Sequence, residues 1–146
     1  PGVYVIKNGT LSVGSGALLT GDGVTFCMVG EDAEVDINGG ATVDIEAPTF
    51  GTYEGFLFIQ DKDSEEEGLV STINGGGSIK MVGTIYLPKQ TVKITGNGSF
   101  GINSPLMPII ADSFLIRGNG VFQIDMDEAD MDIELPMTND GSVIMN

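Results

Sequence analysis

The amino-acid sequence predicts an all-β protein, a right-handed parallel β-helix in which about five to six coils stack into a three-sided solenoid. Apolar runs of three to five residues recur along the chain, glycine-rich segments separate them, and the pattern repeats about every 22 to 24 residues. Short strands joined by corners at a fixed period are typical of solenoids.

The stretch 35–48 shows the pattern most clearly. Residues 35–37 and 43–45 both read Val-Asp-Ile, and residues 38–40 between them read Asn-Gly-Gly. In a strand of this composition the two apolar side chains share one face and the carboxylate lies on the other. Asn and Gly tolerate left-handed backbone conformations, so the segment between the strands is expected to be a sharp corner. Asp36 and Asp44 are therefore expected to face solvent.

Read in order, the apolar runs sort into three walls, which we call A, B and C. Wall A is expected at residues 2–6, 23–27, 55–59, 83–87 and 108–111. Wall B is expected at 10–13, 34–37, 70–73, 91–94 and 113–116, and wall C at 17–19, 42–45, 78–81, 99–102 and 121–124. Each coil then contributes one strand to each wall, and successive coils pair in parallel.

The spacing within wall B supports this arrangement. Its equivalent residues are Val13, Ile37, Ile73, Ile94 and Ile116, which are 24, 36, 21 and 22 positions apart. The one long interval contains an insertion at 61–68. Each of these residues is followed within two positions by a glycine, so we expect the B-to-C corner to have one repeated shape.

Wall A departs from simple alternation. Aligning its glycines places Val5, Phe26, Phe58 and Tyr86 in an inward ladder, and Tyr4, Leu57 and Ile85 outside. The wall is then apolar on both faces, as in a strand that is covered on both sides. One explanation is that the insertions 47–54 and 61–68 fold back over it. The other is a docking surface for a protein partner or a second copy of the chain; its predicted residues are Tyr4, Leu57, Ile59, Ile85 and Leu87.

Composition and charge exclude several functions. The chain has 146 residues, 41% of them hydrophobic, which suits one domain with a continuous core. It has no histidine, so imidazole chemistry is excluded. A net charge of -15 argues against nucleic acid and anionic membrane surfaces as partners. No run reaches the ~20 apolar residues of a membrane span. The single Cys27 has no partner within the chain for a disulfide.

Two acidic segments are the candidates for metal chemistry. Hard cations such as Ca²⁺ need several converging oxygen ligands, and alternating carboxylates can supply them. The candidate ligands are Asp61, Asp63 and Glu65 in the first segment and Asp125, Asp127 and Asp130 in the second. Neither segment has EF-hand spacing or the nonapeptide repeat of Ca²⁺-binding β-rolls. The alternative is a solvated loop and a charged edge that opposes end-to-end strand pairing. No other cofactor is expected.

Residues 1–125 are expected to form the β-helix and 126–146 an acidic C-terminal segment. That segment is either a partial sixth coil or a capping hairpin around Asp140 and Gly141. The first residue, Pro1, falls inside a predicted strand, so we expect a fragment or a processed product with further sequence upstream.

The ordered combination of eight segments resembles the C-terminal β-helix region of TadG-like proteins of the Tad (Flp) pilus assembly system. The resemblance covers residues 1 to about 125 and is carried by PGVYVI (1–6), GVTF (23–26), VDINGGATV (35–43), APT (47–49), GFLFIQD (55–61), STINGG (71–76), GTIYLP (83–88) and IIA (109–111). It implies a non-catalytic structural or assembly role in a bacterial surface pilus or secretion apparatus. It further implies an extracytoplasmic location and protein partners in the envelope, with membrane attachment only through a segment outside this sequence.

Two other classes of function remain open. A carbohydrate-binding or adhesin module is compatible with the outward face that carries Asp36, Asp44 and Thr72. Three-sided β-helices also serve as polysaccharide lyases and glycosidases, with carboxylates and a basic residue in a groove along one face. Lys93 and Arg117 are expected on adjacent coils of wall B, but no carboxylate is expected beside them.

Overall fold

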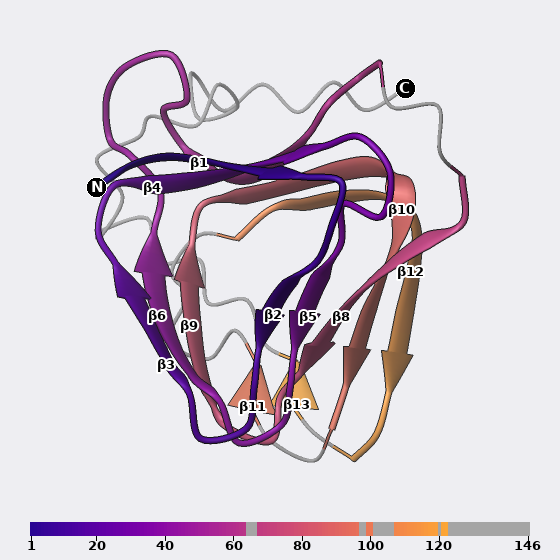
Figure 1. Ribbon diagram of the computed structural model, residues 1–146. Coiled ribbons are helices and arrows are strands. Elements are labelled where there is room, and N and C mark those ends of the chain that lie inside the picture. The colour runs from indigo at the N-terminus through magenta and orange to yellow at the C-terminus, as the bar shows by residue number, and fades with distance from the viewer. Residues whose placement is uncertain (64–66, 97–98, 101–106, 120, 123–146) are drawn as a thin grey trace, which may run out of the picture.

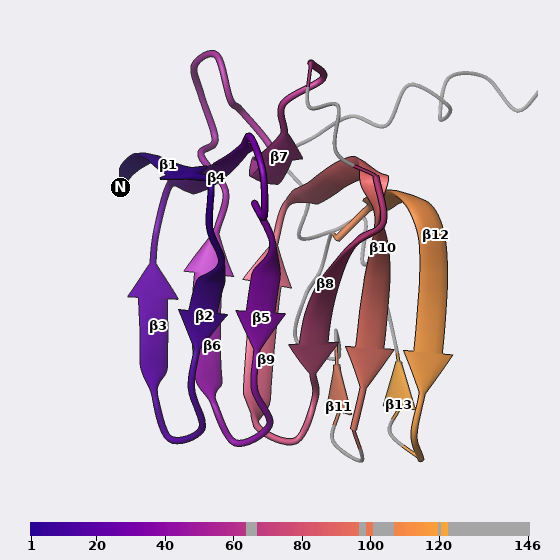
Figure 2. The same ribbon diagram turned by 45° about the vertical axis from the view of Figure 1, so that its right-hand side comes forward.

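A computed structural model describes residues 1–63, 67–96, 99–100, 107–119 and 121–122. These residues form an all-β solenoid of parallel strands and contain no helix. Figure 1 shows the chain circling clockwise as it recedes from the viewer, and Figure 2 shows the coils side by side, so the solenoid is right-handed. The predicted fold class is confirmed, with about four turns in place of five to six.

Wall A and wall B belong to one sheet because two strands run through the corner between them. Wall A begins with β1 (Gly2–Lys7), β4 (Val24–Val29) and β7 (Phe56–Gln60), and wall B with β2 (Leu11–Val13), β5 (Val35–Ile37) and β8 (Leu69–Asn74). The strands that continue from wall A into wall B are β10 (Thr84–Thr95) and β12 (Ile109–Arg117).

Wall C is a separate five-stranded sheet. Its strands are β3 (Leu18–Gly21), β6 (Thr42–Glu46), β9 (Ser78–Val82), β11 (Ser99–Phe100) and β13 (Val121–Phe122). Each wall is therefore five strands deep in the part of the chain that the structure describes. The predicted acidic segment 126–146 lies outside that part.

The register of wall B follows the prediction. Val13 pairs with Ile37, Ile37 with Ile73, Ile73 with Ile94 and Ile94 with Ile116. The three central members, Ile37, Ile73 and Ile94, are buried. Their stacking supplies the apolar contacts that stabilise the centre of this wall.

The predicted register of wall A is wrong by one residue in the first coil. Gly2 pairs with Val24 rather than with Gly23, so Tyr4 pairs with Phe26 and faces inward. Val5 faces outward and is 60% exposed. Side chains alternate with a period of two, so a slip of one residue moves every side chain of the strand to the opposite face. The inward ladder of the first three coils is Tyr4, Phe26 and Phe58, with ring centroids 5.5 and 5.3 Å apart.

A second shift occurs between the third and fourth coils. Thr84 pairs with Phe56 but Ile85 pairs with Phe58, which leaves Leu57 as an extra residue in β7. This irregularity has the form of a β-bulge, in which two residues oppose one. Leu57 and Phe58 are both buried as a result, and Ile85 takes the inward position predicted for Tyr86. Leu57 and Ile85, predicted to face outward, are 0% and 1% exposed.

The B-to-C corners are built from closely stacked backbone. A Cβ atom on Gly77 would collide with the carbonyl oxygen of Ala41, and one on Gly118 with that of Gly96. A Cβ on Gly96 would lie 2.5 Å from Asn74 Oδ1, which already accepts a hydrogen bond from the Gly76 amide at 3.2 Å. Gly77, Gly96 and Gly118 are thus required because the backbone or side chain of the neighbouring coil lies too close for a Cβ atom.

The A-to-B corner is different, because buried polar side chains fill it. The Val35 amide donates to Ser71 Oγ (3.0 Å), Ser71 Oγ donates to Gln90 Oε1 (2.6 Å), and Gln90 Nε2 donates to the Ala33 carbonyl (3.0 Å). Ser71 and Gln90 are 1% and 0% exposed. This chain of hydrogen bonds joins three coils and supplies partners to backbone groups that no ladder satisfies.

Candidate interaction surface

Three of the five residues predicted for the docking surface lie in the hydrophobic core. Leu57, Ile85 and Leu87 are at most 1% exposed, so their side chains contribute no outer surface. Tyr4 is half exposed, but it faces inward at the open end of the first coil. Ile59 alone combines an outward position with partial exposure. The slip in register and the bulge explain these corrections.

The outer face of wall A nevertheless carries an apolar column. Strand pairing aligns Val5 with Cys27, Cys27 with Ile59, Ile59 with Tyr86 and Tyr86 with Ile110. Val5 and Ile110 are 60% and 47% exposed, and the three residues between them are partly buried. We call this column the outer stripe. It crosses the five strands of wall A with no charged side chain in it, which is unusual for a surface.

The 47–54 insertion covers part of the outer stripe. Figure 1 shows this loop rising above wall A near β4. Burial raises the pKa of the Cys27 thiol, and a hydrogen bond with the Tyr53 side chain lowers it by a smaller amount. Cys27 is therefore kept as a neutral thiol beneath the loop. The expectation that this insertion folds back over wall A is supported at Cys27, whereas Val5 and Ile110 stay largely uncovered.

A groove of about 770 Å³ lies where the loop meets the first coil. Its walls come from the start of β1, from the corner at Asp22 and from the insertion, with Glu46, Phe50 and Tyr53 among its lining residues. Phe50 is 81% exposed, an unusual position for a phenyl ring. The groove thus offers aromatic rings beside two carboxylates.

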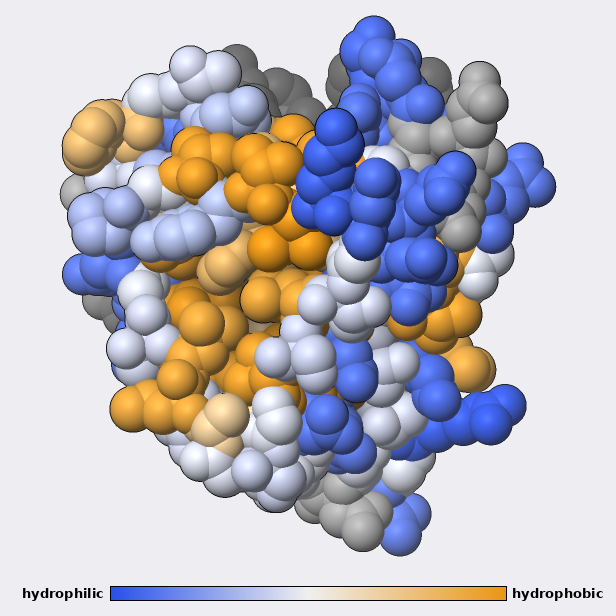
Figure 3. Space-filling model, in the orientation of Figure 1, coloured by the Kyte–Doolittle hydropathy of each residue, from blue (hydrophilic) through white to orange (hydrophobic). Residues whose placement is uncertain are grey.

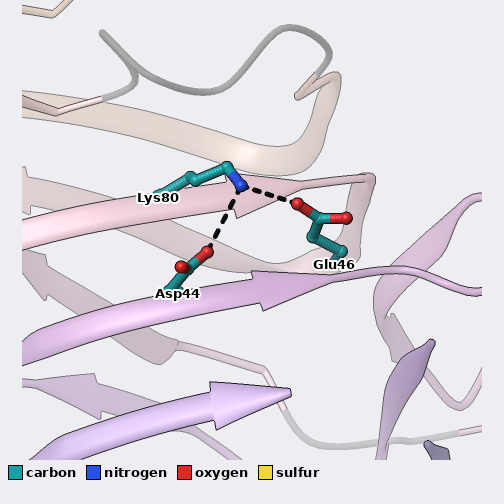
Figure 4. A network of polar contacts seen from close by, with 3 residues as sticks. All are labelled: Asp44, Glu46 and Lys80. Atoms are coloured by element: carbon teal, nitrogen blue, oxygen red, sulfur yellow. Dashed lines mark hydrogen bonds and ion pairs between the residues drawn. The ribbon is translucent and has the colours of Figure 1, made fainter. Parts of the chain in front are cut away.

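Lys80 on wall C forms the clearest ionic cluster (Figure 4). Its ammonium Nζ lies 2.6 Å from Glu46 Oε1 and 3.4 Å from Asp44 Oδ1, across the pairing of β9 with β6. The hydrogen bond with Glu46 contributes most to raising the pKa of Lys80, partial burial opposes it, and the charges of Glu46 and Asp44 add to the rise. Lys80 is held as a cation that joins two coils, and an amine that is protonated at neutral pH is neither a base nor a nucleophile there.

The candidate calcium ligands form no cluster among the described residues. Asp61 Oδ1 accepts a hydrogen bond from the Asp63 amide at 3.1 Å, a local turn. Asp63 also lies 3.5 Å from Lys62 Nζ, with both side chains largely exposed. No group of three or more carboxylate, cysteine or histidine side chains suited to a metal occurs in the part that the structure describes. Glu65, Asp125, Asp127 and Asp130 lie outside it.

The basic pair considered for polysaccharide cleavage lies on the outer face of wall B. Lys93 pairs with Thr72 on one side and Leu115 on the other, and Arg117 pairs with Thr95. The two cations are thus diagonal neighbours on adjacent coils. The register partners of Lys93 on both sides carry no carboxylate that could act beside it as an acid or base.

The outer stripe was hidden in the sequence by the glycine alignment. Each of its five residues is apolar and two positions from another outward residue, so the correct register would have revealed it. The first coil offered two alignments, with Gly2 opposite either Gly23 or Val24. Nothing in the residues of β1 alone favoured the second alignment.

Fold and surface together define a parallel β-solenoid with an apolar outer face on one wall. Comparison with known proteins gave no match among family models, curated sequences or solved structures. Within the described residues, no helix has the length and hydrophobicity needed to span a membrane.

Proposed function

We propose that the chain is a non-catalytic structural or assembly domain of a bacterial surface pilus or secretion apparatus, and that it docks onto a protein partner through the outer stripe. The observation that carries the proposal is the continuous apolar column on the outside of wall A. An apolar surface that runs the length of a solenoid and is only partly covered by a loop is typical of an interaction site.

The polar contacts support a structural role. Among the described residues these contacts link one coil to another, as the bonds of Glu34 with the Val70 amide, Thr91 with Ser113 and Lys80 with Glu46 illustrate. A scaffold needs this distribution, whereas a catalytic site gathers its polar groups around a substrate. The resemblance to TadG-like proteins gives the same role, with an extracytoplasmic location.

The test uses two substitutions matched in chemistry and exposure. Ile110→Lys places a charge on the outer stripe, and Val70→Lys places one on the outer face of wall B; the two residues are 47% and 40% exposed. In cells that produce the protein, Ile110→Lys should abolish its co-purification with surface fibres and reduce their number in electron micrographs. Val70→Lys should change neither. If both variants co-purify with the fibres as the wild-type chain does, wall A is not the docking surface.

A second candidate, carbohydrate binding, is favoured by the groove. Exposed aromatic rings can pack against the C–H faces of sugars, and carboxylates accept hydrogen bonds from hydroxyl groups. A glycan array with the wild-type chain and Phe50→Ala tests this role, which requires binding that the variant loses. An array without a binder would exclude it.

A further inference from the structure

The corner between wall B and wall C contains the same tetrapeptide in two successive coils. Residues 37–40 and 73–76 both read Ile-Asn-Gly-Gly, and the two segments stack because Ile37 pairs with Ile73. Asparagine is a thermolabile residue. Its side-chain amide is most open to attack by the next backbone nitrogen when glycine follows, because glycine has no Cβ to block the approach and leaves the backbone free to turn. The two identical segments therefore differ in this reaction only through their surroundings.

In the third coil, the surroundings hold both reacting groups in place. The Gly75 amide, which would be the nucleophile, is buried and donates to the Thr95 carbonyl at 2.7 Å. The Asn74 side chain is fixed in a local turn, since its Oδ1 accepts a hydrogen bond from the Gly76 amide at 3.2 Å. A Cβ atom on Gly96 would lie 2.5 Å from the same oxygen, so the next coil leaves the side chain little room to move.

In the second coil, the same two groups are unrestrained. Asn38 is exposed, and among the described residues neither its side-chain amide nor the Gly39 amide has a hydrogen-bond partner. The turn is closed by other atoms, because the Ala41 amide donates to the Asn38 carbonyl at 3.2 Å. Figure 3 shows pale and blue residues along the lower edge of the molecule, where Figure 1 places the B-to-C corners, so this edge is polar. Nucleophile, electrophile and water can therefore meet at Asn38.

We propose that Asn38 is a site of covalent self-modification, at which the chain deamidates through a cyclic imide. The Gly39 nitrogen attacks the side-chain carbon Cγ of Asn38 and forms a new C–N bond. The side-chain nitrogen leaves as ammonia and takes the proton that the Gly39 nitrogen gives up. Water then opens the succinimide ring at either carbonyl, which yields aspartate or isoaspartate. Ammonia is lost, water is gained, and no oxidant or reductant takes part.

The reaction changes this corner in two ways. Both products add a negative charge to a chain whose net charge is already -15. Isoaspartate also lengthens the backbone by one carbon, at a place where neighbouring coils are in close contact. A Cβ atom on Gly76 would lie 3.3 Å from the Gly39 Cα, and one on Gly40 would lie 2.8 Å from Ser15 Oγ. The lengthened corner must shift against both neighbours, so the isoaspartate form should be less stable.

Asn8 and Gly9 form the remaining Asn-Gly pair that the structure describes in full. Asn8 Oδ1 accepts a hydrogen bond from the Glu31 amide at 3.1 Å, and a Cβ atom on Gly30 would collide with the same oxygen. The side chain is thus held against the second coil and is not free to turn towards Gly9. Asn8 should therefore react more slowly than Asn38.

This inference goes beyond the proposed function and does not rest on it. The test keeps the 146-residue chain in mildly alkaline buffer and follows each asparagine by peptide mapping with mass spectrometry. In the folded chain Asn38 should lose its amide at least about tenfold faster than Asn74, the factor that corresponds to one hydrogen bond held by the attacking nitrogen. In concentrated urea the two should react at equal rates, because their local sequences are identical.

Two variants provide matched controls. Asn38→Gln, whose longer side chain must close a larger and slower-forming ring, should show no mass change at position 38, and Asn8→Gln should leave the reaction of Asn38 unchanged. The isoaspartate form, separated by chromatography, should unfold at a lower urea concentration than the unmodified chain. Equal rates at Asn38 and Asn74 in the folded chain, or a faster reaction at Asn8, would overturn the proposal. An unchanged urea midpoint would overturn the predicted effect on the corner.

Discussion

At the two kinds of corner in this solenoid, neighbouring coils pack against each other in opposite ways. At the B-to-C corner, glycines remove the side chains so that coils can approach until backbone meets backbone. At the A-to-B corner, Ser71 and Gln90 fill the space and supply hydrogen bonds to backbone groups. The A-to-B corner also varies in length between coils, because the third coil carries an insertion at 61–68 between β7 and β8, whereas β10 passes the same corner without interruption.

The comparison predicts that the two corners fail by different mechanisms. The glycine corner should be sensitive to added volume, and the polar corner to lost hydrogen bonds. The straight walls between them should tolerate the loss of a surface contact. Three pairs of variants test these expectations, in order of decreasing effect.

Gly77→Ala should have the largest effect. Its Cβ would meet the Ala41 carbonyl, so the backbone of one coil must move, at a cost of about 3 kcal/mol in the free energy of unfolding. Gly14→Ala is the matched control, because Gly14 occupies the same corner of the first coil and has no atom near the added Cβ. It should change the free energy by no more than about 0.5 kcal/mol. Urea denaturation followed by circular dichroism measures the free energy of unfolding of both variants. Equal effects would show that close contact between coils is not the reason why residue 77 is a glycine.

Gln90→Met should destabilise the polar corner. It leaves the Ala33 carbonyl and the Ser71 hydroxyl without their buried partner, which costs about 2 kcal/mol. Gln60→Met is the control, since Gln60 is also buried and accepts a hydrogen bond from the Lys89 amide. Among the described residues, Gln60 Nε2 is a buried polar atom without a hydrogen-bond partner, so this substitution should cost about 1 kcal/mol or less. A larger loss for Gln60→Met would mean that the Gln90 network contributes little.

Lys80→Gln should have the smallest effect. Lys80 is partly exposed, and an ion pair of this kind stabilises by about 0.5 kcal/mol. The pKa of Lys80 is raised in the folded chain, so its contribution is present at neutral pH and is lost as the pH rises above the ordinary lysine value of 10.5. Lys62→Gln, which removes an almost fully exposed ion pair, should change nothing. Denaturation at pH 7 and near pH 11 separates the two variants. Stability of Lys80→Gln equal to the wild type at pH 7 would contradict the prediction.

The sequence was sufficient for the fold class and for wall B. The reason is that Val13, Ile37, Ile73 and Ile94 each end an alternating run just before a corner rich in glycine. Hydrophobic alternation and turn chemistry therefore agree on one register. The sequence also predicts that the B-to-C corner has one repeated shape. The physical reason for its glycines, which is close contact between the backbones of neighbouring coils, follows only from the three-dimensional structure.

Wall A could not be predicted with the same accuracy. Its residues are apolar at consecutive positions, so alternation does not distinguish one face from the other. The bulge at Leu57 changes the register in mid-wall, and no turn residue marks it. The glutamine of the polar corner was also missed, because Gln90 is adjacent in space to Ala33 but 57 positions away in the chain.

The register that creates the outer stripe is the central claim, and native Cys27 allows a direct test. Val5 pairs with Cys27 on adjacent coils, at about the 4.8 Å spacing of neighbouring strands, which suits a disulfide. Val5→Cys should form an intramolecular disulfide with Cys27 on mild oxidation, detected as a loss of two hydrogen atoms by mass spectrometry. Ile6→Cys pairs with Met28 and faces inward, so it should keep two free thiols. A disulfide in Ile6→Cys and none in Val5→Cys would support the glycine alignment and contradict the outer stripe.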